Sequence, residues 1–150
     1  MKEQERLITS FVEAVNRQDW SLLQSLVALN FRRHSYAAGT PGVSNRDQLV
    51  QFLKDEFATF PDAHESIEDI FSDGDKVAVR HRFQGTQKGA LGPHPPSGKR
   101  MISEYIAIYR IEDGRIVEAW AEWDNLSGLA QLGLADAQQR AAGDVRDARA

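Results

Sequence analysis

Three carboxylates alternate with apolar side chains near the end of the chain, where residues 116–124 read IVEAWAEWD. Successive side chains of a strand point to opposite faces, so Glu118, Glu122 and Asp124 share the face of Trp120. A carboxylate among apolar groups and near a second carboxylate has a raised pKa, because burial and like charge both disfavour ionisation. Such a group suits general acid/base catalysis. A second interpretation stays open, in which the two glutamates face water and the aspartate caps the helix that follows.

The turn before this strand, at the sequence EDG, decides which side chains lie opposite the carboxylates. A turn of two residues puts Ser103 opposite Asp124, whereas a turn of three puts Ile102 there and Glu104 opposite Glu122. We prefer the turn of three residues, because it gathers the isoleucines of both strands on one face. This face supplies three candidate ligand contacts, Glu104, Ile106 and Trp120.

Two histidines and one arginine are the candidate partners of the carboxylates. His81 and Arg80 fall on opposite faces of one strand, so one of them points into the fold. His81 is either an acid/base partner or a hydrogen-bonded core histidine, and Arg80 either polarises a carbonyl group or forms a structural salt bridge. His34 precedes a glycine-rich loop, where it either lines the mouth of a cavity or lies on the surface. Asp124, His34 and Arg80 are the candidate catalytic residues, and each keeps the structural alternative given above.

Composition excludes several other kinds of site. The 150 residues include no cysteine, and the histidines show no HxH or HxxxH spacing, so we expect no metal site. No GxSxG motif occurs, and the net charge of −4 with no basic run argues against a nucleic-acid partner. No apolar stretch approaches ~18 residues, and the charged N-terminus is unlike a signal peptide. We expect a cytoplasmic protein with no membrane segment.

The elements that would position these residues follow from the hydrophobic periodicity. A period of 3.6 predicts three helices, over 4–17, about 20–27 and 45–60, with a short strand before the third. A period of two then predicts two hairpins, over 63–86 and 101–124, before a last short helix. The result is one α+β domain over residues 1–134, and residues 135–150 form a frayed helix or a disordered tail. Two further candidate ligand contacts are Tyr36, in the glycine-rich loop, and Phe57, on the buried face of the third helix; with His81 they complete the candidate substrate-binding set.

Several short motifs resemble those of one known family. They are FPD at 60–62, GDKVAVR at 74–80, GTQKGALG at 85–92, PPSGKR at 95–100 and the segment YRIEDGRIVEAWAEWDNLSGLAQLG. Together they resemble the SnoaL-like polyketide cyclases, also called ester cyclases, within the superfamily of nuclear transport factor 2 and ketosteroid isomerase.

The resemblance implies a fold, a reaction and a partner. The fold is a cone, in which a curved antiparallel sheet wraps around helices and leaves an apolar cavity for a small carbonyl ligand. The reaction is an intramolecular aldol condensation without a cofactor, and Asp124 matches the family's proton-transfer position. The resemblance also implies a homodimer that pairs through the outer face of the sheet.

The chain departs from the family at Gln87, where relatives commonly have a histidine. Glutamine donates and accepts hydrogen bonds but does not titrate, so any proton transfer at this position is lost. Alternative functions on the same fold are a binding or assembly module without chemistry and an isomerase, dehydratase or hydrolase.

Overall fold

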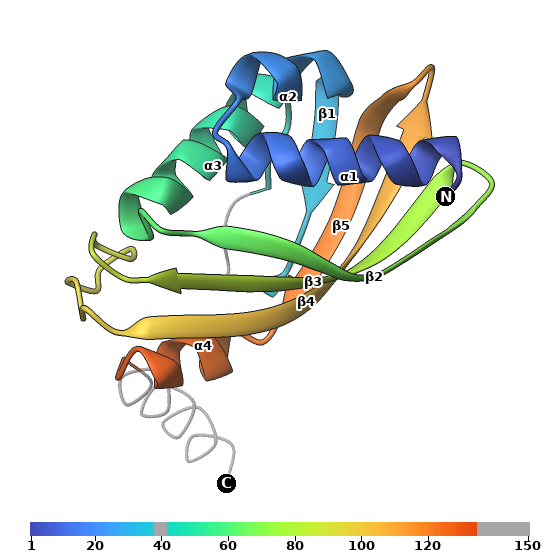
Figure 1. The fold of residues 1–150 in the computed structure, drawn as a ribbon. Helices are drawn as coiled ribbons and strands as arrows, with labels where there is room; N and C mark the ends of the chain where they lie inside the picture. The colour runs from blue at the N-terminus through green and yellow to red at the C-terminus, as the bar shows by residue number, and fades with distance from the viewer. Residues whose placement is uncertain (38–41, 135–150) are drawn as a thin grey trace, which may run out of the picture.

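A curved sheet of five strands with helices on one face forms the domain (Figure 1). The structure is a computed structural model and describes residues 1–37 and 42–134. The tail expected over 135–150 lies outside the described residues. In chain order the elements are α1 (Glu3–Asn16), α2 (Trp20–Leu26), β1 (Val27–His34), α3 (Arg46–Thr59), β2 (His64–Asp73), β3 (Lys76–Thr86), β4 (Arg100–Glu112), β5 (Arg115–Trp123) and α4 (Asn125–Gln131). The predicted α+β class and the order of elements are confirmed.

Side chains with hydrogen-bonding oxygens set the starts of two helices. The Asp19 carboxylate accepts a hydrogen bond from the backbone N–H of Leu22 at 3.0 Å, so α2 begins after Asp19. The Asn45 side chain accepts from the backbone N–H of Gln48 at 2.8 Å and starts α3 in the same way. These contacts satisfy backbone donors that have no partner in the first turn of a helix.

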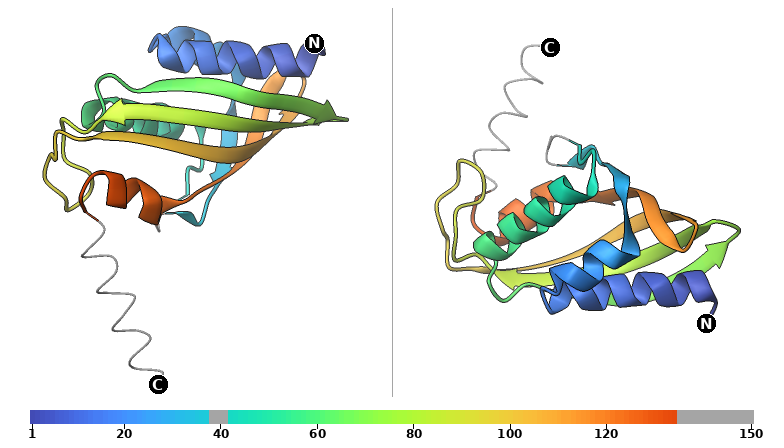
Figure 2. Two further views of the ribbon diagram at one scale, coloured as in Figure 1. Left: turned by 60° about the horizontal axis from the view of Figure 1, so that its bottom comes forward. Right: turned by 90° about the horizontal axis from the view of Figure 1, so that it is seen from above.

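The sheet has the order β1-β5-β4-β3-β2 and is mixed. The pairs from β2 to β5 are antiparallel, but β1 runs parallel to β5, with His34 beside Trp120. The expectation of an antiparallel sheet is therefore wrong for this one pair. A parallel pair needs a long connection, and the chain between β1 and β5 contains α3 and the other three strands. Figure 2 shows the curvature of the long strands and places α4 at the open end of the β4–β5 hairpin, opposite its turn.

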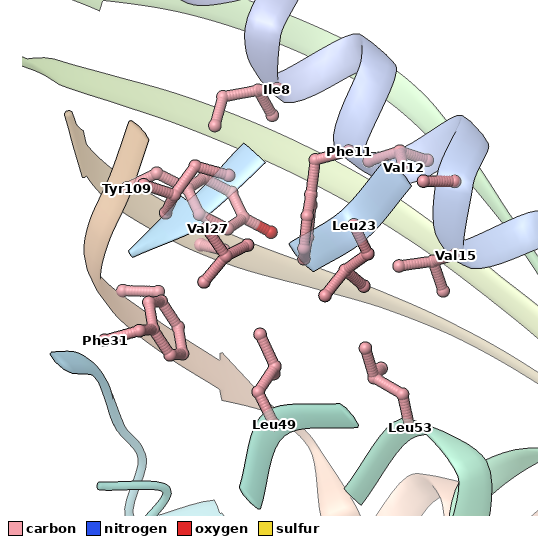
Figure 3. Close-up of a cluster of buried hydrophobic side chains, with 14 of the residues drawn as sticks. Ile8, Phe11, Val12, Val15, Leu23, Val27, Phe31, Leu49, Leu53 and Tyr109 are labelled. Atoms are coloured by element: carbon pink, nitrogen blue, oxygen red, sulfur yellow. The ribbon is translucent and has the colours of Figure 1, made fainter. Parts of the chain in front are cut away.

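The main core lies between the helices and the inner face of the sheet. Side chains of α1, α2, β1, α3 and β4 point toward one another there (Figure 3). The inner face of β3 contributes Val77 and Val79, both almost fully buried. A smaller cluster of Phe60, Phe83 and Leu132 lies nearer α4. Between the clusters the sheet carries polar side chains, which the next section describes.

No helix in the described part of the chain has the length and apolar character needed to cross a membrane.

Candidate active site

A cavity of about 330 Å³ opens between the inner face of the sheet and the helices α3 and α4. Its walls are mostly apolar and aromatic, as is usual for a small-molecule site. The polar or charged side chains of its lining are Arg33, Asp55, Glu56, Thr59, Glu65, Ser103, Tyr105, Tyr109 and Asn125. The nine residues predicted from the sequence as catalytic or substrate-binding are absent from this lining.

The inner and outer faces of β5 are the reverse of the expected ones. Ala119, Ala121 and Trp123 line the cavity, whereas Glu118 and Glu122 belong to the other face. The alternation of side chains is as expected, but the expectation that the carboxylate face is the inner one is wrong. Both faces of this strand are apolar enough that alternation alone did not identify the inner one.

The register of the β4–β5 hairpin also differs from both alternatives. Asp113 and Gly114 form a two-residue turn and both have positive φ, so the preferred three-residue turn is wrong. A bulge at Val117 then shifts the pairing by one residue and places Ile106 opposite Glu122. Ile106 shares the face of Glu122, as expected, but because this face is the outer one, Ile106 is 60% exposed rather than inside.

Four predicted site residues form polar contacts on the outside of the molecule. The His34 ring stacks on Trp120 with ring centroids 5.4 Å apart, and its Nε2 lies 2.7 Å from Glu118 Oε2. Arg80 pairs with Asp69 at 2.7 Å and with Glu104 at 3.2 Å. The expectation that these side chains face the cavity is wrong, because none of them belongs to its lining. Arg80 follows its second interpretation, a structural salt bridge.

The other predicted site residues lie at the surface or in the core. Tyr36 is 93% exposed, and Phe57 packs edge-to-face against Trp20 in the main core. Asp124 is exposed, and its carboxylate accepts a hydrogen bond from the backbone N–H of Ser127 at 3.0 Å. The contact matches the second interpretation of this residue, a helix cap. Its catalytic role remains an untested prediction without support from this placement.

His81 alone among the predicted residues contacts the polar wall of the cavity, which is formed by Glu65, Tyr105 and Tyr109. It lies behind these residues and does not itself line the cavity. Its side chain is 1% exposed, and its Nε2 lies 2.9 Å from the hydroxyl of Tyr109. Its ring also stacks on Tyr105, with centroids 4.6 Å apart. Burial lowers the pKa of His81 to about 4, so the ring is neutral at physiological pH.

Glu65 lies at the centre of this polar wall. The Tyr105 hydroxyl is 2.8 Å from Glu65 Oε1, and Glu65 Oε2 is 3.6 Å from His81 Nδ1. Neither Oε2 nor Nδ1 has a hydrogen-bond partner, although both atoms are buried. Burial, together with the charge of Glu56, raises the pKa of Glu65 to about 8, so this carboxyl is mostly protonated at pH 7. The ionised carboxylate accepts a hydrogen bond from the Tyr105 hydroxyl. The protonated carboxyl is able instead to donate a hydrogen bond to the Tyr105 oxygen, which leaves the Tyr105 O–H free to donate to a ligand.

A second carboxyl of the cavity wall belongs to α3. Burial raises the pKa of Glu56 to about 7, and the nearby charge of Arg33 partly opposes this rise. Both carboxyls therefore titrate near physiological pH, with Glu65 the weaker acid. Pairs of carboxyls with different, raised pKa values are typical of sites in which one acts as base and the other as acid.

Three of these cavity residues have a signal in the sequence, and Glu65 does not. Glu56 follows Leu49, Phe52 and Leu53 at helical spacing and so falls on the apolar face of α3. Tyr105 and Tyr109 alternate with the isoleucines of β4 and therefore had to face the opposite side. The isoleucines were placed inside because they are more apolar. Glu65 had no comparable signal, because β2 has a bulge at Glu68 that breaks its alternation.

Gln87, the departure from the family motif, forms hydrogen bonds that stabilise the loop around it. Its side chain is fully buried, and Nε2 donates to the carbonyls of Gly89 and Pro95, each at 3.2 Å. Its Oε1 accepts from the backbone N–H of Ser97 at 3.1 Å. Gln87 thus holds together the loop between β3 and β4, and its amide is not part of the cavity lining.

Comparison with known proteins assigns the family. The family model of the SnoaL-like polyketide cyclases matches residues 5–132. The chain belongs to the SnoaL-like polyketide cyclase family. This membership indicates an enzyme. No curated protein sequence matches the chain.

Solved structures share the fold of this family member. IdmH of Streptomyces antibioticus, a polyketide cyclase candidate, is 31% identical with a TM-score of 0.76 over 89% of this chain and 99% of its own. AclR of Streptomyces galilaeus, a hydroxylase candidate, is 26% identical with a TM-score of 0.76 over 87% of this chain and 96% of its own. A protein of Catenulispora acidiphila with a ketosteroid isomerase-like fold is 21% identical with a TM-score of 0.73 over 87% and 95%. That last likeness shows the fold alone.

Proposed function

We propose that this protein is a cofactor-independent enzyme that moves a proton at the carbon next to a carbonyl group, in an aldol-type ring closure. One observation carries the proposal: Glu56 and Glu65 line the same apolar cavity, with pKa values raised to about 7 and about 8. Proton transfer is most effective when the pKa of the catalytic group lies near the working pH. Family membership supports the same kind of reaction.

The two carboxyls have different roles in this mechanism. The Glu56 carboxylate takes a proton from the carbon, and the C–H electron pair enters an enolate. Tyr105 donates a hydrogen bond to the developing oxyanion, while protonated Glu65 donates to Tyr105. Donors that are already oriented in a cavity with little water stabilise such charge more than they would in bulk water.

The remaining steps restore the enzyme. The enolate carbon attacks a second carbonyl of the same ligand, which forms the C–C bond and an alkoxide. The alkoxide then takes the proton back from Glu56. The product is an isomer of the substrate, so neither protons nor electrons are gained or lost overall and the cycle needs no redox partner.

Exchange of carbon-bound hydrogen tests the proposal without knowledge of the natural substrate. We would follow deuterium incorporation into 2-tetralone in D₂O by proton NMR, with wild-type protein, Glu56→Gln and Glu65→Gln. Each substitution should slow catalysed exchange by ~100- to 10,000-fold, the usual contribution of a general acid or base. Glu122→Gln, on the outer face of β5, is the matched control and should exchange at the wild-type rate. Wild-type rates in both cavity variants, with circular dichroism showing a folded protein, would contradict the proposal.

A further inference from the structure

Among the described residues, Arg33 is the one lysine or arginine that lines the cavity. It belongs to β1, and its guanidinium carbon lies 4.7 Å from the ring centroid of Phe52 and 5.4 Å from that of Trp123. Cation–π contacts of this kind hold a guanidinium in place without using its N–H donors. The donors of Arg33 are therefore oriented in a mostly apolar cavity.

The charge of Arg33 has no ion-pair partner within the described residues. Arg80 and Arg110, two arginines of the outer sheet face, differ in this respect, since each pairs with two carboxylates. No hydrogen bond from the Arg33 side chain is found in that same part of the chain either. A partly buried cation without a partner is costly, because an apolar surrounding disfavours its charged form.

Glu56 compensates for this charge only in part. Burial lowers the pKa of Arg33 and the charge of Glu56 partly opposes this fall, but the two side chains form no ion pair among those of the described residues. With a pKa of about 7, Glu56 is ionised in only about half of the molecules at neutral pH. The positive charge of Arg33 is thus only partly compensated, and a negatively charged group of a ligand would complete the compensation.

We propose that the cavity binds its ligand through a carboxylate, or an ionised enol, at the Arg33 guanidinium. The substrate class is then a mostly apolar carbonyl compound that carries an anionic oxygen group, and the carbonyl part of this statement rests on the proposed function. A planar guanidinium matches a carboxylate with two parallel hydrogen bonds, which a lysine cannot reproduce. The aromatic rings beside Arg33 provide apolar surface for the rest of the ligand.

Calorimetric titration with matched probes tests this assignment. The acid 2-naphthoate and the neutral 2-naphthamide have nearly the same shape, and the wild-type protein should bind the acid about 10- to 100-fold more tightly. Arg33→Gln should reduce this ratio to about one, and Arg33→Lys should retain only part of it. Arg32→Gln removes the neighbouring, exposed arginine of the same strand and should leave the ratio unchanged.

A further pair of probes distinguishes the two kinds of anion. The ionised enol 4-hydroxycoumarin is compared with neutral coumarin, and a preference for the enol alone would assign the site to enolates. Equal affinity for charged and neutral members of both pairs in wild-type protein would overturn the inference, whether or not the Arg33 variants fold. A ratio lost in Arg32→Gln but kept in Arg33→Gln would also overturn it. Binding does not require turnover, so these outcomes are independent of the deuterium exchange that tests the proposed function.

Discussion

Glu65 and Asp124 are both carboxylates near the ends of strands, but their surroundings differ. Asp124 is exposed and accepts a backbone hydrogen bond, whereas Glu65 lies among aromatic rings, and one of its oxygens has no partner. Burial without a compensating cation raises a carboxyl pKa, and hydrogen bonds to the ionised form lower it. The buried position of Glu65 therefore brings its pKa near neutrality.

The raised pKa of Glu65 predicts how stability depends on pH. Its folded pKa of about 8 exceeds the reference value of 4.5, so between these values the folded state holds a proton that the unfolded chain has lost. Stability should consequently fall as the pH rises through this range, with Glu56 contributing up to about pH 7. His81 acts in the opposite direction but only below pH 6.5, because its folded pKa is about 4.

Urea unfolding at pH 6.5 and pH 8.5 measures the contribution of the two glutamates to the pH dependence of stability, because His81 contributes only below pH 6.5. The free energy of unfolding of the wild-type protein should be lower at pH 8.5 by on the order of 2 kcal/mol. Glu65→Gln should show a clearly smaller decrease, since glutamine does not titrate. An equal decrease in wild-type and variant would mean that Glu65 has an ordinary pKa.

Substitutions of Asp124 distinguish its role as a helix cap from a role in catalysis. Asp124→Asn keeps an oxygen that accepts the Ser127 N–H, so its stability should stay within ~0.5 kcal/mol of wild type, while Asp124→Ala should lose ~1 kcal/mol. Both variants should retain the wild-type rate of deuterium exchange, because the carboxylate does not line the cavity. Loss of exchange in a stable Asp124→Asn protein would restore the catalytic role that the family motif predicts.

At the scale of elements, the sequence predicted which segments are helices and strands but not which strand face is inside. Helix periodicity and capping are local properties of the sequence, and the starts of α2 and α3 after Asp19 and Asn45 are accordingly close to the predicted ones. Which face of a strand lies inside depends instead on the volume of its side chains and on the space that the whole fold leaves for them. Ala107, Ala119 and Ala121 are small, and they face inward because the space beside them is the cavity, while bulkier Ile106 is outside.

Enlarging one of these alanines should reduce the cavity without disturbing its acids. Ala121→Val adds two methyl groups on the cavity side of β5, where valine also suits a strand. We expect an unchanged or higher melting temperature, since filling a cavity commonly adds ~0.5–2 kcal/mol, together with weaker binding of 2-naphthamide. Ala78→Val, on the outer face of β3, is the control and should not affect binding. Unchanged ligand affinity in Ala121→Val would show that the ligand does not reach β5.

At the scale of the whole molecule, apolar side chains cross the outer face of the sheet in a row. Strand pairing joins Phe71, Ala78, Ile108 and Trp120 in sequence, and Ile106 lies in the next row. Phe71 and Ile106 are more than half exposed. This surface is of the kind that protein–protein interfaces bury, and it supports the homodimer expected from the family.

The oligomeric state of a charged variant tests this expectation. Wild-type protein should sediment as a dimer at micromolar concentration, and Ile106→Glu should shift it toward the monomer, because the new carboxylates would be buried without partners. Leu22→Glu, on α2, is a control with similar chemistry away from the sheet. A wild-type monomer, or a dimer that Ile106→Glu leaves intact, would contradict pairing through this face.

The contacts of Gln87 have a consequence for how quickly different parts of the protein open to solvent. A glycine- and proline-rich connection usually exchanges its amide hydrogens within seconds, as a mobile loop does. Here the N–H groups of Lys88 and Gly89 donate to Thr59 at the end of α3, and a side chain at Gly89 would meet the Ala58 carbonyl oxygen at 2.3 Å. The loop should therefore exchange as slowly as the helix it touches, and Gln87→Ala should speed the exchange of the loop while the core strands keep their protection. This end of the cavity then behaves as a fixed wall, and its shape selects ligands by fit rather than by closing over them.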